Sequence, residues 1–137
     1  MESPVRLALS ALFLASALVS GCVKGPGYPD PRPFPGEPRI DGRWSSNWGR
    51  MKLQQSGRQV EGTVEYRDGK LKGVIEGDLL LFEWQQPSNR AEGVLSAKGK
   101  GWMRISHDNT RMAGTWGYRS RYEGGGSWNA ERPVDPE

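Results

Sequence analysis

Three consecutive residues, Ser106, His107 and Asp108, carry the hydroxyl, imidazole and carboxylate groups that nucleophilic hydrolases use. A catalytic triad needs these groups oriented toward one another in space, beside an oxyanion hole, whereas neighbours in one short run point apart. The run continues into Asn109 and Thr110, a composition typical of a turn. We therefore predict a turn here and a protein that is not an enzyme.

Metal and cofactor chemistry also lack the residues they need. The chain has one histidine and one cysteine, too few for the usual zinc ligand set. An oxygen-only calcium site at Asp108 and Asn109 would lack EF-hand spacing. Residues 124–126 are three glycines, which predict a flexible hairpin loop rather than a phosphate cradle. No metal and no cofactor is expected.

The single cysteine, Cys22, stands directly after an apolar run. Residues 7–19 carry no charge, and the run is shorter than the roughly 20 residues that a membrane-spanning helix needs. Arg6 precedes it, and the small residues Ser20 and Gly21 follow it. This pattern predicts a secretory signal peptide over residues 1–21.

The sequence Val19-Ser20-Gly21-Cys22 resembles the lipobox of bacterial lipoproteins. The resemblance implies cleavage before Cys22, diacylglycerol on its thiol, further acylation (palmitate, for example) of the new amino terminus, and anchorage in the bacterial envelope. Val23 is not the aspartate that holds such proteins at the inner membrane, which implies the outer membrane. The alternatives are an ordinary signal peptide with a stray cysteine, or an uncleaved anchor.

Six tryptophans are the other residues that could bind something. A few such rings can fill a small core, or some can line an opening and stack on an apolar molecule or a sugar face. Trp84 shares strand parity with Leu80 and Phe82, which predicts a core position. The candidate ligand or partner contacts are Trp48, Trp102, Trp116 and Tyr118.

Parity separates these candidates. Trp116 and Tyr118 share the face of Met112 and are expected to point inward, whereas Trp102 alternates against Met103 and is expected to be more exposed. Trp48 lies in a stretch that resembles a turn.

Residues 22–39 carry six prolines and are predicted to be a stiff, polyproline-like tether without core contacts. A docking site for a proline-reading domain is the alternative. The remaining residues 40–133 are predicted to form one domain, followed by a tail at 134–137 that is predicted to be disordered.

Period-two alternation between glycine-rich turns predicts that this domain is all-β. The expected strands are 51–55, 59–66, 70–76, 79–85, 91–97, 101–106, 111–118 and 127–131. The expected turns are 55–57, 68–69, 77–78, 98–99 and 107–109. Such short connections make neighbouring strands antiparallel, so we predict an up-and-down meander closing into a small barrel of about eight strands. A two-sheet sandwich is the alternative.

Gly42-Arg43-Trp44, Trp48-Gly49, Gly62-Thr63 and the stretch from Trp128 to Arg132 resemble the avidin family, within the lipocalin-like barrels. The resemblance implies the same meander topology. It does not imply biotin binding, because Ser46, Arg50 and Val64 stand where that family places polar biotin contacts.

The formal net charge of +3 is too small to indicate a nucleic-acid partner. We expect a membrane-anchored envelope lipoprotein whose barrel binds a small apolar or glycan-like ligand. The alternative is a structural or assembly accessory lipoprotein with a solid barrel that docks on another envelope protein.

Overall fold

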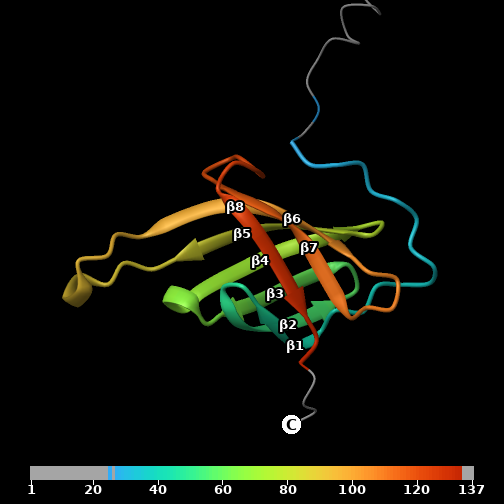
Figure 1. The fold of residues 1–137 in the computed structure, drawn as a ribbon, viewed down its shortest axis with the longest axis horizontal. Helices are drawn as coiled ribbons and strands as arrows, with labels where there is room; N and C mark the ends of the chain where they lie inside the picture. The colour runs from blue at the N-terminus through green and yellow to red at the C-terminus, as the bar shows by residue number, and fades with distance from the viewer. Residues whose placement is uncertain (1–24, 26, 134–137) are drawn as a thin grey trace, which may run out of the picture.

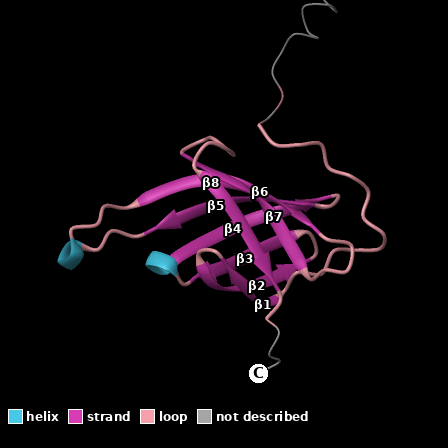
Figure 2. Ribbon diagram, viewed as in Figure 1, coloured by secondary structure: helices cyan, strands magenta, loops and turns pink. Residues whose placement is uncertain are grey.

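The computed structural model describes residue 25 and residues 27–133; the predicted signal peptide, Cys22 and the predicted tail lie outside the described residues. Within the described part, the chain forms eight strands and two short 3-10 helices (Figures 1 and 2). The strands are β1 (Gly42–Ser46), β2 (Gly49–Ser56), β3 (Gln59–Val64), β4 (Gly69–Glu76), β5 (Leu79–Gln86), β6 (Ala97–Ile105), β7 (Arg111–Tyr118) and β8 (Gly126–Glu131). The 3-10 helices are η1 (Tyr66–Asp68) and η2 (Arg90–Glu92). None of the described helices has the length and apolar character needed to cross a bilayer.

Each strand pairs antiparallel with its neighbour in sequence, and β1 pairs with β8 through Ser45↔Glu131 and Ser46↔Ala130. This last pairing closes the sheet and leaves no open edge. The predicted all-β meander and its closure into a small barrel are confirmed, and the sandwich alternative is wrong.

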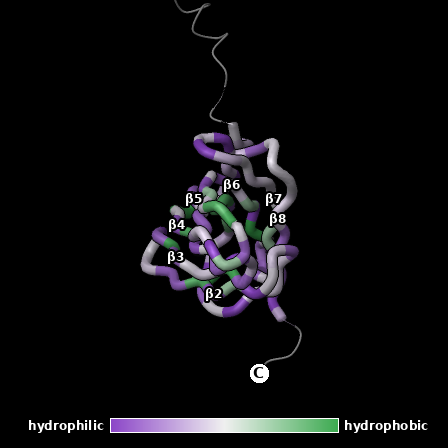
Figure 3. The backbone as a smooth tube through the Cα atoms, turned by 90° about the vertical axis from the view of Figure 1, so that its left-hand side faces the viewer, coloured by the Kyte–Doolittle hydropathy of each residue, from purple (hydrophilic) through white to green (hydrophobic). Residues whose placement is uncertain are grey.

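The core lies inside the barrel, where alternate residues of each strand point inward. Leu80, Phe82 and Trp84 of β5 are all buried in it, as their shared parity predicts. Figure 3 shows short hydrophobic stretches among hydrophilic ones along the barrel wall, the pattern expected of a sheet with one dry face.

Several strand predictions differ from the structure. Within the predicted strand 91–97, residues 91–96 form a loop that includes the end of η2, and Ala97 already begins β6. The loop forms because the side chain of Asn89 accepts a hydrogen bond from the Glu92 N–H and Gly93 takes a left-handed conformation (φ 69°). Leu95, which supplied the alternation there, is 85% exposed. The predicted turn 98–99 is also wrong, because both residues lie inside β6.

Two further differences concern β1 and the end of β3. Strand β1 was not predicted, because only Trp44 of its five residues is buried and no alternation is visible. Strand β3 ends at Val64 rather than at residue 66, and Tyr66 lies in η1 with its side chain exposed. The expected tight turn at 68–69 is therefore a longer connection.

The connections divide between two ends of the barrel. One end has the β1–β2, β3–β4, β5–β6 and β7–β8 connections and includes both 3-10 helices, shown in cyan in Figure 2. We call it the mouth end. The β2–β3, β4–β5 and β6–β7 turns form the opposite end.

Residues 27–39, here called the strap, pack against the barrel and its turns before the chain enters β1 (blue to cyan in Figure 1). The Arg32 N–H donates to Asp78 Oδ1 at 2.9 Å, and Phe34 meets the His107 ring edge-on with centroids 5.5 Å apart. Phe34 also packs on the core cluster. The prediction that this segment has no core contacts is wrong.

The carboxyl end of the strap makes further polar contacts with barrel residues. Gln55 donates from Nε2 to the Pro38 carbonyl at 2.8 Å, and its Oε1 accepts from the Ile40 N–H at 2.7 Å. The Arg39 N–H donates to Asn109 Oδ1 at 2.8 Å. Prolines keep the strap extended, and barrel side chains satisfy the backbone groups of Arg32, Pro38 and Arg39. We call this barrel end the strap end.

Candidate functional site

A cavity of about 280 Å³ opens at the mouth end of the barrel. Its aromatic lining comes from separate parts of the chain: Trp48 before β2, Tyr66 in η1, Trp84 on β5, Trp116 and Tyr118 on β7, and Trp128 on β8. Drug-sized ligands occupy pockets of roughly 300–1,000 Å³, so this cavity suits a smaller molecule.

Trp116 lies at the centre of the aromatic lining. Its ring centroid is 5.6 Å from Trp48, 5.5 Å from Trp84 and 5.1 Å from Tyr118, at interplanar angles of 82°, 89° and 80°. These edge-to-face arrangements are the favourable ones for aromatic pairs. The backbone of Gly125 and Gly126 approaches the Trp116 ring so closely that a Cβ on Gly125 would lie 2.4 Å from its Cζ3.

The indole N–H of Trp116 is buried and has no hydrogen-bond partner. The other tryptophans of the mouth all donate: Trp48 to the Ser127 carbonyl at 3.2 Å, Trp84 to the Gly117 carbonyl at 3.1 Å, and Trp128 to Met51 Sδ at 3.3 Å. An unpaired buried donor costs roughly 1–3 kcal/mol, and each one in a folded protein needs an explanation. A ligand atom that accepts this N–H would supply one.

The rim of the cavity is basic. Arg67 and Lys70 line it, and no acidic residue does. The pKa of Arg67 is raised because its Nε donates to the Tyr66 hydroxyl at 3.0 Å, so the guanidinium stays charged. Arg67 and Asp68 both take left-handed conformations, with φ of 53° and 52°. Consecutive non-glycine residues in this region store strain, a feature that clusters at ligand sites.

Three of the four predicted contact residues meet at this cavity: Trp48, Trp116 and Tyr118. Tyr118 was expected to point inward, but it is 54% exposed. Trp102 lies on the outer wall of β6, where its Nε1 donates to Glu123 Oε2 at 3.2 Å. It does not line the mouth cavity.

Sequence reasoning missed other mouth residues. Trp84 was assigned to the core, which is correct, but its ring also forms part of the cavity wall. Tyr66 was predicted to end a strand, and Arg67 was assigned to no element. The available signal was an aromatic residue, Tyr66, followed by a basic one, Arg67, shortly before Gly69.

The Ser106–Asp108 run forms the β6–β7 turn. Ser106 Oγ donates directly to Asp108 Oδ1 at 2.7 Å, and Thr110 Oγ1 donates to the same carboxylate at 2.6 Å. The hydrogen bonds from Thr110 and Ser106 lower the pKa of Asp108 to about 2. The serine proton is thus held by the aspartate, while His107 packs on Phe34 of the strap.

Among the residues that the structure describes, no group of three or more histidine, cysteine, aspartate or glutamate side chains could hold a metal ion. The predicted lipid attachment at Cys22 lies outside the described residues. The eight-stranded antiparallel barrel is consistent with the lipocalin-like and avidin-like topology that the sequence resembles. Searches of protein families, curated proteins and solved structures find no significant match to this chain.

Proposed function

We propose that this chain is a lipid-anchored envelope protein whose barrel binds one small ligand at the mouth and catalyses no reaction. The observation that carries the binding proposal is the aromatic cavity at the mouth, which is lined in part by Trp116, a residue with a buried, unpartnered N–H. The ligand then has an apolar or ring-shaped body, such as a sugar ring, and a hydrogen-bond acceptor on its edge. The basic rim favours a ligand without positive charge.

The anchoring part of the proposal rests on the lipobox-like residues 19–22. Diacylglycerol on Cys22 together with an acylated amino terminus gives the two or more chains that stable membrane binding needs. Val23 supports the outer membrane over the inner membrane, and no nucleic acid is expected as a partner in that compartment. Replacement of Cys22 by serine is expected to abolish acyl labelling, and continued labelling of that variant would contradict the anchor.

The second candidate is an accessory protein that docks on another envelope protein. The filled interior favours it, because Met51, Phe82 and Trp128 belong to one continuous buried cluster inside the barrel. The two candidates differ in whether the mouth cavity takes up a small molecule.

Tryptophan fluorescence separates them. The full chain in nonionic detergent is titrated with N-acetylglucosamine, whose acetamide carbonyl is an acceptor, and with octanoate, an apolar carboxylate. We expect a saturable change in the emission with at least one of these probes. Trp116→Phe is expected to weaken binding about fivefold, because it removes one hydrogen bond.

Trp102→Phe is the matched control, because it makes the same chemical change on the outer wall. It should leave the affinity unchanged. An equal loss in both variants, or no saturable change with either probe, would contradict ligand binding at the mouth and favour the accessory role.

A further inference from the structure

The outer wall of the barrel carries a row of basic side chains without an acidic neighbour in the same row. Register places Lys52 of β2 opposite Thr63 of β3, Thr63 opposite Lys70 of β4, Lys70 opposite Gln85 of β5, and Gln85 opposite Lys98 of β6. Arg119 extends the row, because its N–H donates to the Lys98 carbonyl at 3.0 Å. We call Lys52, Lys70, Lys98 and Arg119 the basic row.

All four cations are exposed, and none makes an ion pair with another described residue. Adjacent strands lie about 4.8 Å apart, so lysines on alternate strands recur at about 10 Å intervals. Cations at such separations repel each other weakly in water and attract any anion that bridges them.

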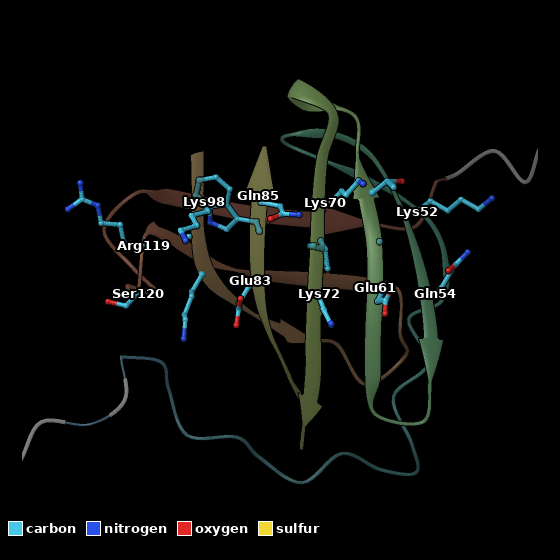
Figure 4. A pocket seen from close by; sticks show the side chains of 16 residues that line it. Lys52, Gln54, Glu61, Lys70, Lys72, Glu83, Gln85, Lys98, Arg119 and Ser120 are labelled. Atoms are coloured by element: carbon cyan, nitrogen blue, oxygen red, sulfur yellow. The ribbon is translucent and has the colours of Figure 1, made fainter. Parts of the chain in front are cut away.

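The next row along the strands is different. There Glu61 lies opposite Lys72, Lys72 opposite Glu83, and Glu83 opposite Lys100. Cross-strand pairs of opposite charge stabilise a sheet and cancel each other's field. The wall therefore has one neutralised row and one uncompensated basic row, side by side, as the upper and lower labels of Figure 4 show.

The wall is hollowed along these rows. The two rows line a groove of about 820 Å³ that spans β2 to β6. Figure 4 shows its side chains spread across neighbouring strands. Thr63 and Gln85 stand between the lysines and add a hydroxyl and an amide to the same line. Cations thus alternate with uncharged hydrogen-bonding groups along the groove.

From this arrangement we infer that the groove binds an extended acidic polysaccharide, with its carboxylates on the basic row and its hydroxyls on Thr63 and Gln85. A single polymer chain can lie along one row and avoid the glutamates of the next. A flat anionic bilayer would cover both rows and would meet Glu61 and Glu83 as well. A sugar polymer carries hydroxyl groups between its carboxylates that can meet Thr63 and Gln85, whereas a polyphosphate chain has none.

The test uses the full chain in nonionic detergent and a fluorescently labelled oligogalacturonate, with binding followed by anisotropy. The variant Lys52→Gln/Lys70→Gln/Lys98→Gln is expected to raise Kd about tenfold, the sum of three exposed ion contacts. It should also flatten the dependence of log Kd on log salt concentration, because fewer counterions are exchanged.

The matched control removes the same net charge at exposed residues that do not line the groove, with Arg32→Gln/Arg90→Gln/Arg111→Gln. It should change Kd less than twofold, and Trp116→Phe at the mouth should leave Kd unchanged. The fully methyl-esterified oligogalacturonate, which keeps the hydroxyls and loses the charges, should not bind.

Three results would overturn the inference. Equal weakening by the control would mean that net charge alone attracts the probe. Displacement of the probe by phosphatidylglycerol mixed micelles but not by phosphatidylcholine ones would assign the row to an anionic membrane surface. Tighter binding of inorganic polyphosphate than of the oligogalacturonate would assign it to a phosphate polymer.

Discussion

The two ends of the barrel differ in how their buried polar groups are hydrogen-bonded. At the strap end the chain itself covers the turns, and Asp78, which is 2% exposed, accepts from the Arg32 N–H and from Arg104 Nη1 at 2.7 Å. At the mouth end Trp116 keeps a buried donor without a partner. Satisfied polar groups rigidify, and unsatisfied ones mark places where another molecule can contribute. The strap end therefore contributes stability, whereas the mouth end retains capacity for binding.

The largest change in stability is expected from removal of the strap. Deleting residues 25–38 removes the packing of Phe34 and the hydrogen bonds to Asp78 and Gln55, so the free energy of unfolding should fall by about 3 kcal/mol. Urea denaturation followed by tryptophan fluorescence measures it.

Arg32→Ala is the control, because only the backbone of Arg32 contacts Asp78. It should cost less than about 0.5 kcal/mol. A deletion variant as stable as the full chain would show that the strap is a free tether after all.

A smaller effect is expected from the Asp78 carboxylate. Burial by itself raises the pKa of Asp78, but the Arg32 N–H and Arg104 outweigh burial and hold the pKa below the ordinary value of 3.8. A lowered pKa in the folded state gives stability that is complete above pH 4 to 5 and is lost as pH falls through the folded value. Asp108, with a pKa of about 2, adds a loss of the same sign between pH 4 and 2.

Asp78→Asn should therefore cost about 2 kcal/mol at pH 7 and flatten the acid limb of the stability curve. Chemical denaturation from pH 7 to pH 2 measures both quantities. Asp30→Asn is the matched control, since Arg104 contacts only the backbone carbonyl of Asp30. An unchanged slope in Asp78→Asn would remove Asp78 from the account of the strap end.

The smallest expected change in stability concerns two tryptophans at the mouth. Trp84→Phe loses the hydrogen bond to the Gly117 carbonyl, whereas Trp116→Phe loses no bond at all. Trp84→Phe should therefore cost about 1 kcal/mol more than Trp116→Phe in the free energy of unfolding without ligand. Equal costs would show that the Trp116 N–H already has a partner, such as a bound water.

Much of the barrel could be predicted from alternation alone, and the exceptions have physical causes. Strand β5 is recognisable because its inward residues are large and apolar, whereas β1 buries only Trp44 and shows no period. The run around Leu95 alternates without being buried, because Asn89 and Gly93 set a local turn that overrides it.

The candidate site could be predicted only in part. Trp48, Trp116 and Tyr118 were chosen for their exposure or parity, and the structure brings them together. Trp102 was also chosen, and it lies on the outer wall, on the face of β6 opposite Met103 that its parity predicts, away from the mouth cavity. Parity gives the face of a strand, but it does not give the height of a residue in the barrel.

The class of fold follows from the amino-acid pattern alone, because period-two alternation and short turns favour a closed antiparallel meander. The position of the proline-rich segment is visible only in the folded barrel, because its backbone N–H and carbonyl groups contact Asp78, Gln55 and Asn109 far along the chain. The tertiary structure also decided which tryptophan lacks a partner and which lysines share a row. Those properties depend on strand register, and register is fixed by the whole sheet.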